Sequence, residues 1–277
     1  MSSIIGARHP LRVWTMVLSL LAASIASAAM AQTPEPFAST RPTARIEYWQ
    51  QRLNEIEARL SDPSSLAPIR LVFLGDSITD FWTMAENPWF PGTTGGRAVW
   101  TGTFGGADSA YLALNMGISG DRTEHVLQRI LPRNEGGLGE LDRPDLDPDV
   151  IVLLIGINNS WAAEDPAVSS IFEGVRAVVA AVHARKPRAV IVLQSLLPTN
   201  ETDRNENVVK PVNAALAAFA SASPQSAYVR YLDLYPTFLT PDGQQNRAFF
   251  MDAVHPDEDG YRAWRDRLVP FLDDLRQ

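Results

Sequence analysis

Cysteine is absent from the 277 residues of the chain. The chain therefore has no disulfide, no cysteine nucleophile, no thiolate metal site and no cysteine for lipid attachment. Lysine occurs only at Lys186 and Lys210, and histidine only four times. Acidic residues outnumber basic ones by 32 to 24, for a formal net charge of −8. A nucleic-acid partner is not expected, because such partners require a basic face.

The N-terminal 31 residues have the composition of a Sec signal peptide. Arg8 and Arg12 precede an apolar stretch that ends in Ala29-Met30-Ala31, an A-x-A cleavage pattern. We expect a signal peptide over residues 1–31, a periplasmic or secreted protein, and no stable membrane insertion after cleavage. An uncleaved anchor is the alternative, since the run is nearly long enough to span a bilayer. Cleavage removes two arginines and no acid, which takes the charge from −8 to −10.

The rest of the chain is predicted to form one domain. Residues 32–43 are rich in Pro, Ser and Thr and predict a linker, and residues 44–277 predict a single domain that begins with a helix over residues 44–60. The segments 91–108 and 132–148 are the longest predicted loops. Predicted strands cover residues 69–74, 110–116, 150–155, 189–194 and 228–232, and further predicted helices cover 123–131, 166–186, 205–222 and 257–275.

The alternation of these strands and helices predicts the fold class. Continuous apolar runs such as VIVLLIG indicate strands that are buried on both faces, as in a parallel sheet. Strands that alternate with helices indicate a doubly wound α/β sandwich. Ligands of such sheets bind beyond the carboxyl ends of the strands.

Four polar segments fall at those ends. They are Gly75-Asp76-Ser77 after the first strand, Gly117 to Asp121 after the second, Gly156 to Asn159 after the third, and Asp252 to His255 before the last helix. We therefore expect all four segments to meet at one edge of the sheet.

Ser77 is the candidate nucleophile, and it needs a base because a serine hydroxyl is weak alone. His9 lies in the signal peptide, His183 lies in an Ala/Val-rich helix typical of packing, and His125 is a weaker candidate. His255 is the favoured base. Asp252, three residues earlier, can hold one ring nitrogen and leave the other to accept a proton. The alternative is that Asp252 only caps the turn before the last helix.

Attack on an ester also requires hydrogen-bond donors for the carbonyl oxygen. The candidates are the backbone N–H groups of Ser77 and Gly120 and the side-chain amide of Asn158. For Asn158 the alternative is that its amide satisfies backbone groups of its own turn. The G-x-S-x-G elbow is not present, since Thr79 stands where the second glycine would be.

Taken together, the four segments resemble the SGNH branch of the GDSL hydrolases. The matching stretches, FLGDSITD, NMGISGDRT, IGINN and DAVHP, extend over about residues 70–261. The resemblance implies a flavodoxin-like three-layer α/β/α sandwich of about five parallel strands, without metal or cofactor. It also implies that Ser77 is the nucleophile, that Gly120 and Asn158 complete the oxyanion hole, and that Asp252 and His255 complete a catalytic triad.

The stretch NMGISGDRTEHVLQRI is most similar to the group of platelet-activating-factor acetylhydrolase subunits and their bacterial relatives. That resemblance implies a serine esterase for short acyl groups, acetyl among them, on a small-molecule, glycan or lipid ester; with the signal peptide expected over residues 1–31, the esterase would be exported. Activity is then expected to fall below about pH 6.5, where an ordinary histidine protonates. Trp82 and Trp161 are candidate substrate-binding residues, with core packing as the alternative for each.

Three other functions are open to the sequence. One is a non-catalytic carbohydrate-binding or scaffolding protein with the SGNH fold, and another is a lysophospholipase of the same family. The third is a phosphate or nucleotide binder. It is disfavoured because the chain has neither G-x-x-x-x-G-K-[ST] nor a G-x-G-x-x-G after a strand.

Overall fold

The computed structural model describes residues 36–45, 48–88, 90–106, 109–162 and 164–276. The predicted signal peptide, residues 1–31, lies outside the described residues. The described chain from Pro36 onward forms one compact unit.

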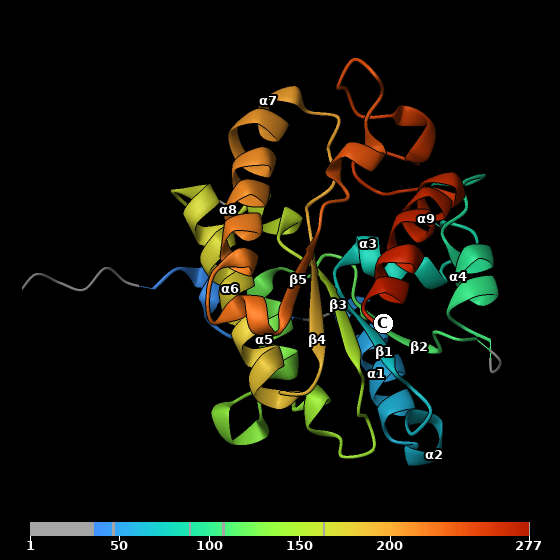
Figure 1. The fold of residues 1–277 in the computed structure, drawn as a ribbon, viewed down its shortest axis with the longest axis vertical. Coiled ribbons are helices and arrows are strands. Elements are labelled where there is room, and N and C mark those ends of the chain that lie inside the picture. Colours follow the sequence, from blue (N-terminus) through green and yellow to red (C-terminus); the bar gives the residue numbers. More distant parts are fainter. Residues whose placement is uncertain (1–35, 46–47, 89, 107–108, 163, 277) are drawn as a thin grey trace, which may run out of the picture. The chain divides into compact units, whose positions relative to one another are not determined.

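A five-stranded, all-parallel sheet forms the centre of this unit (Figure 1). The strands are β1 (Leu71–Gly75), β2 (Ala113–Gly117), β3 (Val150–Leu154), β4 (Val190–Gln194) and β5 (Val229–Leu232). Their order is β2-β1-β3-β4-β5, which is the flavodoxin-like order. The prediction of a parallel, flavodoxin-like sheet is confirmed, and each strand ends within one residue of its predicted end.

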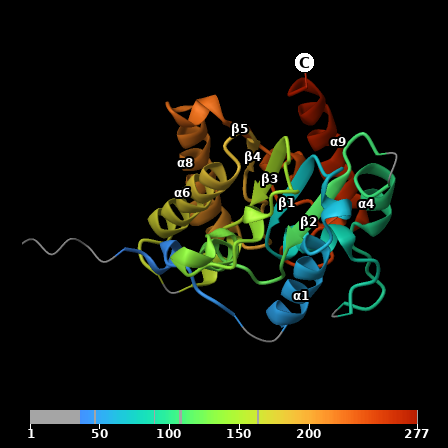
Figure 2. The same ribbon diagram turned by 90° about the horizontal axis from the view of Figure 1, so that it is seen from below.

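Helices cover both faces of the sheet, which gives three layers (Figure 2). One face carries α5 (Thr123–Ile130), α6 (Ala167–Arg185) and α8 (Lys210–Ser221), and the other carries α4 (Arg97–Thr103) and α9 (Glu258–Asp274). The remaining α-helices are α1 (Tyr48–Leu60), α2 (Pro63–Leu66), α3 (Ser77–Asp80) and α7 (Thr202–Arg204), and a π-helical turn over Asn205–Val209 leads into α8.

Helix α1 protects the outer edge of the sheet. The Arg52 side chain donates to the carbonyl oxygens of Gly117 and Asn115 in β2, each at 3.1 Å. Unpaired edge groups invite pairing with another chain, so these bonds close the β2 edge. The same face of α1 also buries Trp49, Leu53 and further apolar residues in the core.

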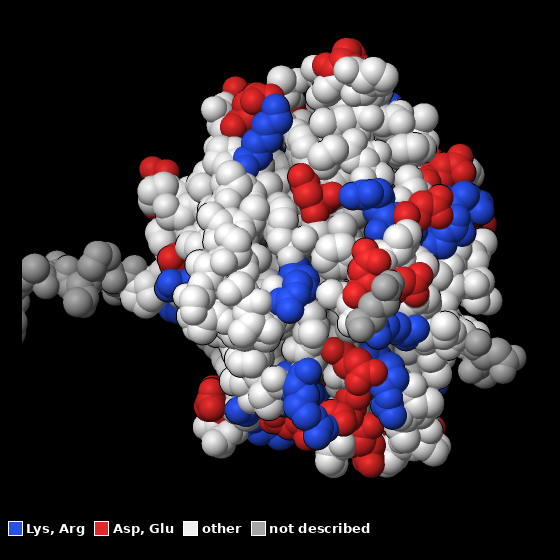
Figure 3. All heavy atoms as spheres, in the orientation of Figure 1, with Lys and Arg blue, Asp and Glu red and all other residues white. Residues whose placement is uncertain are grey.

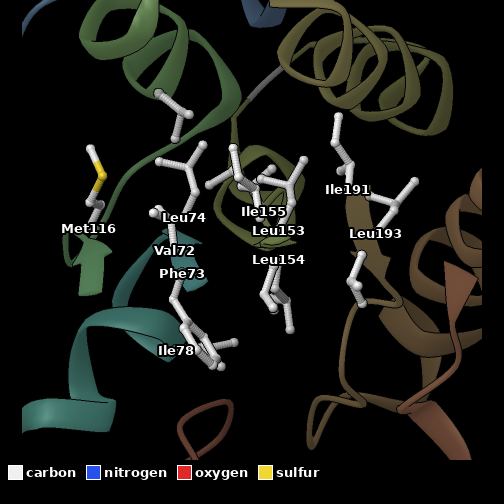
Figure 4. Packing of buried hydrophobic residues seen from close by; sticks show 14 of the residues in the cluster. Val72, Phe73, Leu74, Ile78, Met116, Leu153, Leu154, Ile155, Ile191 and Leu193 are labelled. Carbon is white, nitrogen blue, oxygen red and sulfur yellow. The ribbon is translucent and has the colours of Figure 1, made fainter. Parts of the chain in front are cut away.

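The core lies on both sides of the sheet. Side chains of β1, β3 and β4 project alternately to its two faces, as Val72 and Phe73 do (Figure 4). Among the residues that the structure describes, α6 is the one helix whose length and apolar composition would allow it to cross a membrane. It lies against α5 and α8, and Val175 and Val178 are fully buried, so its apolar face belongs to the core.

Two of the predicted irregular segments are ordered differently. The predicted loop 91–108 contains α4, a seven-residue helix whose Val99 and Trp100 are buried. The described part of the predicted linker 32–43 contains a 3-10 turn, Ala38–Thr40, that is docked on the domain. The Ser39 hydroxyl donates to the Ser170 carbonyl at 2.7 Å. Composition indicated the irregular backbone of this arm correctly but not its docking, which depends on residues far along the chain.

Charges of both signs are intermingled on the face seen in Figure 3. The surface over α8 carries few of them, which fits the run of alanines in that helix.

Candidate active site

The carboxyl ends of β1 and β3 lie at the topological switch point of the sheet, since β2 lies on one side of β1 and β3 on the other. Ligands of open α/β sheets bind at such a point. Two glycines, at the ends of β1 and β2, let α3 pack directly on the sheet. A Cβ at Gly75 would lie 2.3 Å from Thr79 Oγ1, and one at Gly117 would lie 2.3 Å from the Asp80 nitrogen. Ser77 is therefore placed tightly over the end of β1.

Asp76 caps the turn that presents Ser77. Its Oδ1 accepts a hydrogen bond from the Ile78 backbone N–H at 3.0 Å. The side chain is fully buried, and Oδ2 has no hydrogen-bond partner among the described residues. Burial raises the pKa of Asp76 to about 8, despite the bond from Ile78. Burial thus favours the neutral form of Asp76, whose carboxyl group caps the turn from below Ser77.

Ser77, His255 and Asp252 form one hydrogen-bonded chain. The Ser77 Oγ lies 2.8 Å from His255 Nε2, and His255 Nδ1 lies 2.6 Å from Asp252 Oδ2. A carboxylate on Nδ1 fixes the tautomer that leaves Nε2 free to accept a proton. The arrangement can therefore move a proton from the serine hydroxyl to the imidazole.

The loop that carries His255 is held by several backbone contacts. Asp252 Oδ1 accepts from the N–H groups of Val254 and His255 at 2.8 and 2.7 Å. The Phe81 ring lies 4.9 Å from the imidazole, centroid to centroid. Burial by itself would raise the pKa of Asp252, but the hydrogen bond and charge of His255 and the two N–H groups bring it below its ordinary value. Asp252 thus remains a carboxylate that faces the imidazole.

Three groups are candidate oxyanion donors: the backbone N–H groups of Ser77 and Gly120 and the side-chain amide of Asn158. Gly120 has a φ of 79°, a left-handed conformation that favours glycine. Within the described chain, no acceptor pairs with the backbone N–H of Ser77 or of Gly120. The Asn158 amide donates to the Asp121 carbonyl at 2.8 Å, and its second N–H leaves it able to donate once more. The Asn158 amide thus bonds to the backbone of another turn, that of Asp121, and not to its own, and it can still donate to an oxyanion.

A buried ionic network supports this turn from behind. Asp121 pairs with Arg129 at 3.0 Å and with Arg45 at 2.9 Å, and Arg129 also pairs with Glu140 at 3.0 Å. Burial raises the pKa of Asp121 to about 6, although both arginines oppose the rise. Arg45 and Arg129 were not predicted from the sequence, because no motif marks an arginine whose partner lies in another element.

The two predicted substrate-binding tryptophans differ in the structure. Trp82 is fully buried, and its ring packs on Tyr261 and Trp264 at 4.6 and 5.0 Å. Because a substrate cannot reach it, Trp82 is a core residue, and the prediction of a binding role was wrong. Trp161 is 44% exposed, and the Arg204 guanidinium lies 4.3 Å from its ring.

The two other described histidines have structural contacts. His125 Nδ1 accepts from the Arg122 backbone N–H at 2.9 Å, and burial, together with Arg45 and Arg122, lowers the pKa of His125 to about 3. The His183 ring stacks on Tyr228 at 3.6 Å. In the part of the chain that the structure describes, no group of three His, Asp or Glu side chains is placed to hold a metal ion.

Comparison with known proteins identifies the family of this fold and site. A sequence model of the GDSL-like lipase/acylhydrolase family matches residues 73–263. The human platelet-activating factor acetylhydrolase IB subunit alpha1 is 30% identical over 196 residues, which are 69% of this chain and 70% of that protein. The mouse alpha2 subunit is 30% identical over 192 residues, which again are 69% of this chain and 70% of that protein. The chain belongs to the GDSL-like lipase/acylhydrolase family, as the four motifs predicted.

Solved structures agree on the fold. A GDSL-like lipase from Bacteroides thetaiotaomicron has a TM-score of 0.55 at 20% identity, over 82% of this chain and 98% of that one. The acetyl xylan esterase AlAXEase has a TM-score of 0.51 at 18% identity, over 73% of this chain and 98% of that one.

Proposed function

We propose that the protein is a serine esterase that transfers short acyl groups to water. The observation that carries the proposal is the continuous contact from Ser77 through His255 to Asp252, at 2.8 and 2.6 Å. It lies at the switch point of the sheet, beside two backbone N–H groups without acceptors in the described chain.

The first half of the reaction forms an acyl-enzyme. Ser77 Oγ attacks the ester carbon while its proton passes to His255 Nε2. Asp252 stabilises the imidazolium through Nδ1–H. The tetrahedral intermediate collapses, the bond to the alcohol oxygen breaks, and His255 gives its proton to that oxygen. The carbonyl oxygen, which becomes negative, accepts from the N–H groups of Ser77 and Gly120 and from the Asn158 amide.

The second half of the reaction hydrolyses the acyl-enzyme and regenerates the free enzyme. Water takes the place of the alcohol and attacks the acyl carbon as His255 removes its proton. The Ser77–acyl bond then breaks, Ser77 regains the proton, and the carboxylic acid leaves. Two protonation states of one histidine therefore serve both halves of the cycle.

The acyl group is proposed to be short, with acetyl as the leading candidate. The relatives at 30% identity are named acetylhydrolases. In addition, the Ser77 residue is only 4% exposed, and a buried nucleophilic residue suits a small acyl group. The Trp161 ring, three residues after Asn158, is 44% exposed; Arg204 lies over one face, and the other face offers a flat surface on which a sugar ring can stack. An acetylated glycan is therefore the favoured substrate class.

We also propose that the enzyme acts outside the cytoplasm. The support is the Sec-type sequence of residues 1–31, with cleavage after Ala31. N-terminal sequencing of the protein recovered from the periplasm or the medium should begin at Gln32. Recovery of the uncleaved chain in the membrane fraction would favour the anchor instead.

The catalytic proposal is tested with p-nitrophenyl acetate, butyrate, octanoate and palmitate. Wild type should cleave acetate and butyrate best, and Ser77→Ala should cleave none of them above background. A preference for palmitate would contradict the short-acyl proposal and favour a lysophospholipase. Equal inertness of both proteins, with no labelling of Ser77 by a fluorophosphonate, would favour the non-catalytic alternative.

A further inference from the structure

The described segment before α1, residues 36–45, is called here the N-terminal arm. It lies outside the residues that match the family model, which begin at residue 73. Its backbone is nevertheless docked on the domain. The Ala38 N–H donates to Glu164 Oε1 at 2.5 Å, and the Ser39 carbonyl accepts from the Thr123 hydroxyl at 2.8 Å. The arm therefore follows a defined course beside α5 and α6.

The arm ends on the turn that contains Gly120. The Thr43 N–H donates to the Glu124 carbonyl at 3.0 Å, and two residues later the Arg45 side chain reaches the turn. Arg45 Nη1 donates to the Ser119 carbonyl at 3.0 Å and to Asp121 Oδ1 at 2.9 Å. Nη2 lies 2.7 Å from the place that a Cβ of Gly120 would take. One guanidinium thus binds Ser119 and Asp121 and fills the space beside Gly120 that a side chain would take.

The other contacts of the turn leave a defined task for Arg45. The Ser119 N–H donates to Asp80 Oδ2 at 3.0 Å, and Asp121 Oδ2 pairs with Arg129. These bonds hold the two ends of the turn, while Arg45 joins the Ser119 carbonyl to the Asp121 carboxylate across Gly120. The Asp121 carbonyl in turn accepts from the Asn158 amide. Arg45 is therefore connected to both candidate oxyanion donors outside Ser77.

We propose that Arg45 is a positioning residue of the oxyanion hole: from the N-terminal arm it fixes the direction of the Gly120 N–H and, through Asp121, of the Asn158 amide. This inference rests on the proposed esterase function. An interaction of this kind acts on the transition state, so its loss lowers kcat and leaves KM nearly unchanged.

Removal of Arg45 should affect catalysis more than folding. The Arg45 side chain is 26% exposed. After its removal, Asp121 would still be paired with the fully buried Arg129. We expect Arg45→Ala to lower kcat for p-nitrophenyl acetate about tenfold or more, less than the loss of a whole donor. KM should change less than about twofold, and the melting temperature should stay close to that of wild type. Arg45→Lys should be intermediate, because an ammonium group cannot reproduce the planar fork.

Two measurements distinguish a positioning role of Arg45 from a merely structural one: chemical rescue of Arg45→Ala and the rate of covalent labelling of Ser77. Guanidinium chloride at a few millimolar should restore part of the kcat of Arg45→Ala but not change wild type. The rate of fluorophosphonate labelling of Ser77 should fall with kcat, since the phosphoryl oxygen uses the same donors. Arg59→Ala removes an equal charge from an exposed position in the last turn of α1 and is the control; it should label at the wild-type rate.

The outcomes are distinct. Equal kcat and labelling rates in Arg45→Ala and wild type would overturn the inference and leave the esterase proposal standing. A lower melting temperature with loss of activity and no rescue would assign Arg45 to stability alone, which also overturns it. If wild type is labelled at Ser77 but cleaves no ester, the proposed function fails, and the labelling rates still decide the role of Arg45. No labelling of wild type would end both proposals.

Discussion

The substitution Gly120→Ala tests the turn that contains Gly120 through two separate measurements, the stability of the protein and its catalytic rate. Gly120 has a φ of 79°, and a left-handed conformation costs an alanine about 1–2 kcal/mol. The new Cβ would also lie 2.7 Å from Arg45 Nη2, which must move. For a domain of this size, 1 kcal/mol lowers the melting temperature by about 2–4 °C, so a drop of about 2–8 °C is expected. If the turn rotates to relieve the strain, the Gly120 N–H leaves its position and kcat falls about a hundredfold.

Gly136→Ala is the matched control. Gly136 has a φ of 85°, and no other described atom lies within 4 Å of the place that its Cβ would take, so it carries the same backbone strain away from the site. Thermal unfolding by circular dichroism and kcat on p-nitrophenyl acetate are measured for both variants. Both should lose stability to a similar extent, but only Gly120→Ala should lose activity. Wild-type kcat in Gly120→Ala would refute the assignment of its N–H as an oxyanion donor.

Three further changes test other parts of the account. Asp252→Asn should lower kcat about a thousandfold or more, because the amide no longer fixes the imidazole tautomer; a loss below about tenfold on p-nitrophenyl acetate would contradict the triad. The pKa of Asp76 is near 3.8 in the unfolded chain and about 8 in the folded one, so the folded chain keeps a proton that the unfolded chain loses. The stabilising contribution of Asp76 is full below about pH 4 and is lost as pH rises to about 8. In urea titrations, Asp76→Asn should therefore lose less stability between about pH 4 and pH 8 than wild type, and an equal loss would exclude a contribution from Asp76. Trp161→Ala should raise KM for an acetylated xylooligosaccharide about two- to tenfold and change p-nitrophenyl acetate kinetics less; equal effects on both substrates would argue against ring stacking.

The sequence predicted best what depends on local pattern. The buried strands are continuous apolar runs, so β3 and β4 were located to within a residue. Ser77, Gly120 and His255 follow or face strand ends, and the parallel order of the sheet brings those ends together. The fold and the members of the candidate site could therefore be predicted before any contact was known.

What could not be predicted depends on side-chain direction and on distant partners. Trp82 follows Ser77 closely in sequence, but it lies in the 3-10 turn Phe81–Thr83, which directs its ring into the core. The arm of residues 36–45 has the composition of a linker because Glu164 and Ser170, which dock it, lie more than 120 residues away. Arg45 is one arginine among many until the fold places it on the Gly120 turn.

The most direct test of the central claim is to find which residue carries the covalent label after the protein reacts with a fluorophosphonate. Peptide mapping by mass spectrometry should locate one adduct, on Ser77, in wild type, and none in His255→Ala over the same time. A label on another serine, or equal labelling of Ser77 in both proteins, would contradict activation of Ser77 by His255.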